Sequence, residues 1–294
     1  MDRDAITAAV VARLVAEQFP AWADLPVVPV AESGWDNRTF RLGDALTVRL
    51  PTAEWYVAAV AKEHTWLPRL APHLPLAIPE PVALGSPGAG YPWPWSLRRW
   101  IDGRPAGVDR IADPVGFARD LARFLVALWG VDPTGGPAAG AHSFHRGGAL
   151  AVYDDETSAA LETLGTRIDR AAATRMWDDA LAAERTGAPV WFHGDVAEGN
   201  LLVDDVGRLS AVIDFGTSGV GDPACDLVIA WTLFDGSSRA AFVEDVRRDA
   251  ATWARARGWA LWKALITLAA PDAAPRHVDG ARRTRGRLLD PDTV

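Results

Sequence analysis

Three oxygen-bearing side chains within residues 191–226 occur at a spacing suited to magnesium-dependent phosphoryl transfer. Asp195 is followed by Asn200 and, after an apolar stretch, by Asp214. Phosphoryl transfer asks the protein mainly for positioning and charge neutralisation. An aspartate can accept the proton of an attacking hydroxyl, and amide and carboxylate oxygens are hard ligands for Mg²⁺ beside nucleotide phosphates. We therefore predict Asp195 as the catalytic base, and Asn200 and Asp214 as metal ligands.

Two short apolar segments lie between the predicted base and Asp214. Residues 201–203 and 209–213 are rich in Leu, Val and Ile, and the residues between them include the turn formers Asp204 and Gly207. This pattern predicts a β-hairpin. The hairpin would bring the loop of the predicted base back beside the loop of Asp214.

The same stretch resembles the aminoglycoside phosphotransferases, which are small-molecule kinases with a protein-kinase-like fold. Their pattern HGDxxxGN followed by IDFxxxxxGDPxxDLA stands here as HGDVAEGN, IDFGTSGV and GDPACDLVIA. The resemblance extends from residue 28 to residue 265 or so. It implies an α+β, bilobal, protein-kinase-like chain. Residues 1–100 would form a nucleotide-binding lobe with an antiparallel sheet and one prominent helix, and residues 101–294 a mainly helical catalytic and acceptor-binding lobe.

The resemblance also implies the reaction. The γ-phosphoryl group of ATP or GTP would pass to a hydroxyl of a small molecule, with Mg²⁺ as cofactor. The acceptor would be an aminoglycoside-type antibiotic, in which case the protein serves antibiotic resistance, or a macrolide, or a small metabolite such as choline, homoserine or a sugar. His193 would have a structural role beside the base, and Asp226 would hold the backbone of the catalytic loop.

The first hundred residues carry the periodicities of a small sheet with two helices. Apolar spacing and β-branched runs predict helices over 4–19 and 53–70, and strands over 27–30, 39–42, 46–50, 81–84 and 95–100. The polar loop after the first strand contains Ser33, Gly34 and Asn37. Although it lacks the pattern G-x-G-x-x-G, this loop could offer backbone N–H groups and a hydroxyl to nucleotide phosphates.

The strand over 46–50 departs from the kinase pattern, because Arg49 stands where kinases place a phosphate-binding lysine. The chain contains only two lysines, Lys62 and Lys263, and neither lies on that strand. A guanidinium group can grip phosphate oxygens with two parallel hydrogen bonds, so we predict that Arg49 holds the phosphates. Glu63, fourteen residues later, is placed to pair with Arg49 and orient it.

Residues 101–105 look like the hinge between the lobes, and Trp100 and Ile101 are predicted to contact the nucleotide base. Beyond the hinge, apolar spacing and two Asp-Pro starts predict helices from 114 onward and over 155–168, 174–186, 223–231, 242–256 and 259–270. Residues 271–294 show no apolar period and are predicted to be a flexible tail. The long loop over 130–148 carries His142, His145 and Arg146, which could contact substrate or stabilise the loop.

Composition predicts a globular protein of a reducing compartment. The chain is 49% apolar and 23% charged, and its single cysteine, Cys225, excludes a disulfide framework. We therefore expect a cytoplasmic protein, and no apolar run is long enough to predict a membrane partner. The net charge is −8, and residues 151–250 contain 19 acidic against 8 basic residues. That field repels nucleic acid and favours a cationic acceptor, although acidic helix faces also keep proteins soluble.

Two other classes of protein remain open at this point. Arg49 at the lysine position would suit a pseudokinase that binds Mg-nucleotide without turnover. A protein kinase is disfavoured, because Gly221-Asp222-Pro223 follows Asp214 so closely that little chain is left for a peptide platform.

Overall fold

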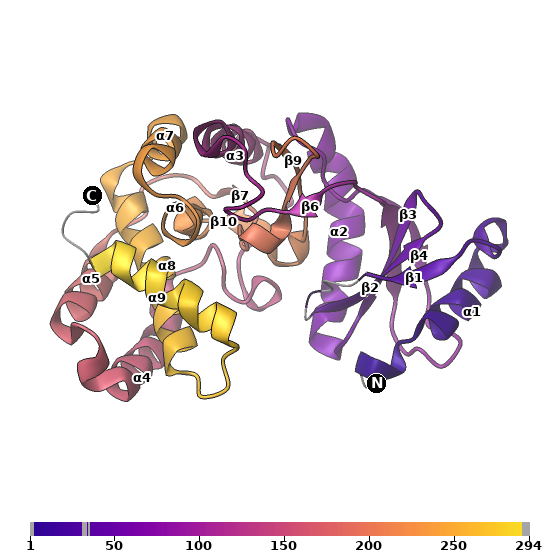
Figure 1. Cartoon of the computed structure of the whole chain (residues 1–294), viewed down its shortest axis with the longest axis horizontal. Helices are drawn as coiled ribbons and strands as arrows, with labels where there is room; N and C mark the ends of the chain where they lie inside the picture. Colours follow the sequence, from indigo (N-terminus) through magenta and orange to yellow (C-terminus); the bar gives the residue numbers. More distant parts are fainter. Residues whose placement is uncertain (1–2, 31–33, 35, 290–294) are drawn as a thin grey trace. The chain divides into compact units, whose positions relative to one another are not determined.

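The computed structural model describes residues 3–30, 34 and 36–289. The chain divides into two compact units, of which the first comprises Met1–Gly103 with Ala211–Gly216, and the second Arg104–Ser210 with Thr217–Val294 (Figure 1). The boundary near residue 100 was expected to separate two continuous lobes. Residues 211–216, which carry Asp214, instead belong to the first unit, and no local pattern signals that long-range grouping.

The first unit is built on a five-stranded antiparallel sheet. Its strands, in spatial order, are β1 (Val27–Pro29), β2 (Asn37–Leu42), β3 (Leu46–Pro51), β5 (Trp95–Arg99) and β4 (Pro81–Gly85). Val48 and Leu97 are paired and buried in the core. Side chains alternate between the faces of a strand, so the paired residues Arg49 and Ser96 project from the opposite face.

Two helices accompany this sheet. Helix α1 (Ala8–Gln18) begins after Thr7, whose hydroxyl accepts a hydrogen bond from the Val10 N–H, and its apolar face joins the core of the sheet. Helix α2 (Val57–Leu70) buries residues at helical spacing, namely Val60, Glu63, Leu67 and Leu70. Glu63 is thus the charged member of an otherwise apolar buried stripe, which requires a positively charged partner.

The second unit is mainly helical, as predicted. It contains α3 (Pro114–Trp129), α4 (Asp154–Leu164), α5 (Arg170–Ala182), α6 (Ile229–Thr232), α7 (Gly236–Val246), α8 (Ala250–Ala269) and α9 (Pro275–Leu289). Helix α8 packs against α4, α5 and α9, whereas α3 packs against α7 (Figure 1). Asp113 caps α3 by accepting hydrogen bonds from two backbone N–H groups, which confirms the Asp-Pro start.

The predicted hairpin is present. Strand β8 (Leu201–Val203) lies between β6 (Arg104–Pro105) and β9 (Leu209–Val212). Asp204 Oδ1 accepts hydrogen bonds from the N–H groups of Val206 and Arg208. Gly207 adopts a φ of 79° and its Cα lies against backbone atoms near Arg110, so a side chain here would clash. The turn residues therefore fix the register of the two strands.

Two helix predictions and one tail prediction for the C-terminal half need correction. Residues 223–231 form a 3-10 helix (Pro223–Val228) followed by the short α6. The helix predicted over 242–256 is interrupted, because Arg247 adopts a left-handed φ of 50° and Asp249 caps a new helix through the Thr252 N–H. The segment predicted to be a flexible tail contains α9, which buries Ala281, Thr284 and Leu288 against its neighbours.

The buried ion pair between Arg255 and Asp222 offers a test of what stabilises the second unit. Arg255 Nε lies 2.6 Å from Asp222 Oδ2, and Arg255 Nη1 donates to the Glu184 carbonyl at 2.9 Å. Removing one partner leaves the other charge buried. We expect Arg255→Met to lower the free energy of unfolding by about 3–5 kcal/mol, measured by urea denaturation. Arg257→Met on the same helix is the control, and an equal loss in both variants would contradict the prediction.

Two further observations concern the whole chain. Cys225 is buried, as expected of a small core residue, and burial raises the pKa of its thiol. Among the described residues, no helix has the length and apolarity required to cross a membrane.

Candidate active site

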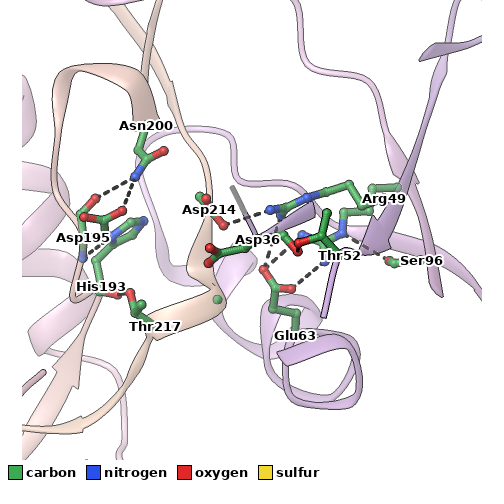
Figure 2. Close-up of polar contacts among 12 residues, drawn as sticks. Asp36, Arg49, Thr52, Glu63, Ser96, His193, Asp195, Asn200, Asp214 and Thr217 are labelled. Carbon is green, nitrogen blue, oxygen red and sulfur yellow. Dashed lines mark hydrogen bonds and ion pairs between the residues drawn. The ribbon is translucent and has the colours of Figure 1, made fainter. Parts of the chain in front are cut away.

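The predicted catalytic loop of the second unit follows β7 (Val190–Phe192), which pairs with β10 (Gly219–Gly221). His193 is fully buried, and its Nδ1 accepts a hydrogen bond from the Asp195 N–H at 3.2 Å. Thr217 Oγ1 donates to the His193 carbonyl at 3.0 Å (Figure 2). His193 therefore orders the backbone around Asp195, in agreement with the structural role expected for it.

Asp226 binds the backbone of the same loop. Its carboxylate is buried and accepts hydrogen bonds from the N–H groups of His193, at 3.0 Å, and Gly194, at 2.7 Å. Burial raises the pKa of Asp226, while the hydrogen bonds from the backbone N–H groups of Gly194 and His193 act in the opposite direction. The expectation that Asp226 holds the catalytic-loop backbone is confirmed.

Asp195 itself is exposed at the surface of the second unit, and Asn200 orients it. The Asn200 Nδ2 group donates to Asp195 Oδ2 and to the Asp195 carbonyl, each at 2.9 Å. Figure 2 shows the amide oxygen of Asn200 turned away from Asp195. The loop thus presents an ordered carboxylate and a neighbouring amide oxygen that these contacts leave unused.

Arg49 and Asp214 meet within the first unit. Arg49 Nη2 lies 2.9 Å from Asp214 Oδ1, and Arg49 Nη1 lies 3.7 Å from Glu63 Oε1 (Figure 2). Burial alone would lower the pKa of Arg49, but the charges of Asp214 and Glu63 raise it above its ordinary value. The guanidinium is therefore a permanent positive charge beside the Asp214 carboxylate.

The pairing predicted between Glu63 and Arg49 exists, but Arg98 has the closer contact. Arg98 donates to both carboxylate oxygens of Glu63, at 3.0 and 2.6 Å. Burial would raise the pKa of Glu63, yet Arg98 and Arg49 together lower it. Our sequence analysis missed Arg98. Its signal was the two-residue alternation of β5, which places Arg98 and Ser96 on the face opposite the buried Leu97.

Asp214 occupies an unusual backbone conformation, with a φ of 68°. Asp and Asn are among the few residues with side chains that tolerate this left-handed region. Lys62, which does not lie on the strand of Arg49, reaches the same turn and donates to the Gly216 carbonyl at 2.7 Å. The turn that presents Asp214 is therefore held by cations from β3 and α2.

Lys62 gives the first unit a charge that changes near neutral pH. Burial lowers the pKa of Lys62 to about 8, although Glu63 and Asp214 oppose the shift. As the pH rises through 8, the ammonium group loses its proton and the positive charge beside the Asp214 turn disappears. A nucleotide is an anion, so the affinity of the protein for nucleotide should fall as the pH rises through 8.

We therefore expect Mg-nucleotide affinity of the wild type to decrease a few-fold between pH 7 and pH 9, since one nearby charge is lost. Titration calorimetry at both pH values measures the effect. Lys62→Arg keeps a charge that does not titrate in this range, so its affinity should stay level. The same decline in that variant would assign the pH dependence to another group.

The predicted phosphate loop is described only in part. Ser33 lies outside the described residues. The Gly34 carbonyl accepts a hydrogen bond from Arg3, and Asn37 begins β2 opposite Pro51. Asp36 was not singled out from the sequence, yet its negative charge is among those that raise the pKa of Arg49.

The two predicted base contacts lie at the end of β5. The backbone N–H of Trp100 donates to the Ala45 carbonyl at 2.8 Å, and the Arg41 guanidinium lies over the Trp100 indole ring. Trp100 Nε1 donates to Asp102 at 2.8 Å. Ile101 is half-buried. The Trp100 N–H is thus already engaged, and the contact of Trp100 and Ile101 with a nucleotide base remains a prediction.

The side chains present fit a nucleotide-borne Mg²⁺ better than a metal held by protein alone. Among the described residues, no group of three or more His, Cys, Asp or Glu could enclose an ion. Mg²⁺ in kinases needs only one or two protein oxygens besides phosphates and water. The Asp214 carboxylate in the first unit and the Asn200 amide oxygen in the second are ligands of that kind.

Comparison with known proteins identifies one matching family and one similar protein sequence. The profile of a family described as "Phosphotransferase enzyme family" matches residues 27–259. A protein of Bacillus subtilis strain 168, YcbJ, described as uncharacterized, is 27% identical over 173 residues, which are 58% of this chain and 54% of YcbJ. This chain thus matches about half the length of that relative.

Solved structures show the same α+β, kinase-like fold. The GDP and kanamycin complex of APH(2")-IIIa superposes with a TM-score of 0.73 at 18% identity, over 94% of this chain and 98% of that one. A macrolide 2'-phosphotransferase from Brachybacterium faecium, MphH, superposes with a TM-score of 0.60 at 22% identity, over 97% and 98% of the two chains.

Proposed function

We propose, because this chain belongs to the phosphotransferase enzyme family, that it transfers the γ-phosphoryl group of ATP or GTP to a hydroxyl of a small molecule. The chain is a small-molecule kinase by that membership. The observation that carries the specific reaction is the exposed Asp195 carboxylate, which Asn200 orients through two hydrogen bonds. A fixed and accessible carboxylate can position a hydroxyl and take its proton.

In the second unit, Asp195 holds the acceptor. Its Oδ atom accepts the hydroxyl proton as the acceptor oxygen bonds to the γ-phosphorus. The bond from that phosphorus to the bridging oxygen breaks, and the nucleoside diphosphate leaves with the electron pair. Asp226 and His193 keep the loop in place through their contacts with its backbone.

In the first unit, Arg49 binds the phosphates and Glu63 with Arg98 holds Arg49 toward Asp214. An arginine with two acidic partners supplies a fixed positive charge of the kind that phosphate needs. This supports catalysis over the pseudokinase alternative. Asp214 and Asn200 would hold Mg²⁺, which neutralises charge on the transferred group when bound.

The single, buried cysteine supports a reducing, cytoplasmic setting.

The experiment that tests this function is nucleoside-diphosphate release with Mg-ATP and Mg-GTP in the presence of pooled hydroxyl compounds. We expect stimulation by at least one pool and its loss when Mg²⁺ is chelated. Nucleotide binding without release in any pool would favour the pseudokinase. Release driven by a generic protein acceptor would reassign the enzyme to the protein kinases.

A further inference from the structure

Five residues of the second unit form a cluster of cations and aromatic rings, here called the basic–aromatic cluster: Arg146, Tyr153, Trp259, Trp262 and Lys263. The Arg146 guanidinium lies 4.6 Å from the Trp262 ring centroid and 5.4 Å from that of Trp259. Tyr153 stacks on Trp262 with centroids 4.1 Å apart, and Lys263 Nζ lies 5.9 Å from the same ring. Rings from α8 and its neighbouring segment thus hold two cations together.

The basic–aromatic cluster lies against the catalytic loop. A Cβ atom placed on Gly194 would be 3.2 Å from the Cβ of Arg146, so the backbone next to Asp195 touches the Arg146 side chain. Phe192 likewise packs on Gly147. The predicted base is also close enough to Lys263 to act on its charge. Arg146 therefore touches the loop that carries Asp195, and Lys263 lies beside the same Trp262 ring as Arg146.

Two carboxylates, Glu156 and Asp195, act on the charge of Lys263, but neither forms a close ion pair with it. Glu156, the other carboxylate close to Lys263, accepts a hydrogen bond from Trp262 Nε1 at 2.7 Å. Among the described residues, Lys263 forms no ion pair within 4.0 Å. A ring stacked on a guanidinium occupies its face, whereas its N–H donors point outward in the plane. Arg146 Nη1 donates to the Phe144 carbonyl at 3.4 Å and the guanidinium also hydrogen-bonds the Tyr153 side chain, which uses part of its five N–H donors.

The charge of Lys263 shows the effect of this crowding. The Lys263 side chain is exposed, yet its surroundings partly desolvate the ammonium group, which lowers its pKa. The positive charge of Arg146 lowers the pKa further. Asp195 and Glu156 act in the opposite direction. When two positive charges lie close together and are partly shielded from water, binding of an anion between them is favourable.

We propose, on the basis of the function proposed above, that the acceptor is a hydroxyl compound that also carries an acidic group, a carboxylate or a phosphate, which Arg146 and Lys263 bind. A polycationic acceptor would instead meet two positive charges beside the base. Near Asp195, Arg146 and Lys263 therefore offset part of the acidic excess of residues 151–250.

The test compares acceptor sets that are matched in hydroxyl content but differ in charge. Full-length protein with Mg-ATP and with Mg-GTP is supplied with hydroxycarboxylic acids, sugar phosphates, neutral polyols or aminoglycosides, and nucleoside-diphosphate release is measured. We expect the strongest stimulation from one of the two acidic sets, and the comparison of these two distinguishes carboxylate from phosphate. Stimulation by neither acidic set overturns the inference.

Variants separate binding of the acidic group from a merely structural role. Lys263→Gln and Arg146→Gln should each raise the KM for the acidic acceptor by about tenfold or more, whereas kcat should change much less. Lys263→Arg should recover most of the affinity. Arg175→Gln, which removes an exposed cation from α5 of the same unit, should leave KM unchanged. A KM that stays constant in both cluster variants overturns the inference.

The failure of this inference differs from the failure of the proposed function. If aminoglycosides stimulate release best and Lys263→Gln increases that rate, the enzyme is a kinase with a cationic acceptor. If no set stimulates release and nucleotide does not bind, the proposed function itself fails.

Discussion

Asp195→Asn is expected to lower kcat by about 10²–10⁴-fold with little change in nucleotide affinity. This is the range in which removal of a general base acts. Asn keeps the size of the side chain but cannot accept the hydroxyl proton. The backbone of the loop should survive, because Asp226 and His193 hold it through main-chain atoms rather than through the Asp195 carboxylate.

The measurement is steady-state nucleoside-diphosphate release with the stimulating acceptor, accompanied by calorimetric titration of Mg-nucleotide. Asp205→Asn is the matched control, since Asp205 is an exposed carboxylate in the turn of the nearby hairpin. Normal turnover by Asp195→Asn would show that another group accepts the proton.

Asp214→Asn should weaken Mg-dependent nucleotide binding by about 10- to 100-fold, which corresponds to about 1.4–2.8 kcal/mol. The substitution removes a charged metal ligand and the partner that Arg49 contacts at 2.9 Å. Asn tolerates the left-handed φ of 68° at this position as Asp does. The turn should therefore keep its shape, and the loss of nucleotide affinity should result from the removed negative charge.

Titration with and without Mg²⁺ provides the internal control for Asp214→Asn. The wild type should lose affinity when Mg²⁺ is chelated, whereas the variant should respond weakly to chelation. An equal response of both proteins to Mg²⁺ would remove Asp214 from the metal site. A lower thermal stability in the variant would indicate that the turn itself had been disturbed.

Several elements near the site followed directly from local sequence. The turn residues Asp204 and Gly207 fixed the hairpin, because a side chain that accepts backbone hydrogen bonds and a glycine at positive φ act over a few residues. Asp113 with Pro114 likewise fixed the start of α3. The same local reasoning failed at Arg247, whose left-handed conformation interrupts an apolar pattern that continues across it.

By itself, the sequence determined the family, the α+β class and the residue types of the catalytic loop, since each depends on neighbours in the chain. Tertiary structure alone decided the partners of the charged residues. Glu63 pairs most closely with Arg98, and Lys62 binds the Gly216 carbonyl. Arg146 stacks on Trp262. Each of these contacts joins segments far apart in the chain, and a buried charge selects whichever opposite charge, carbonyl or ring the fold brings within reach.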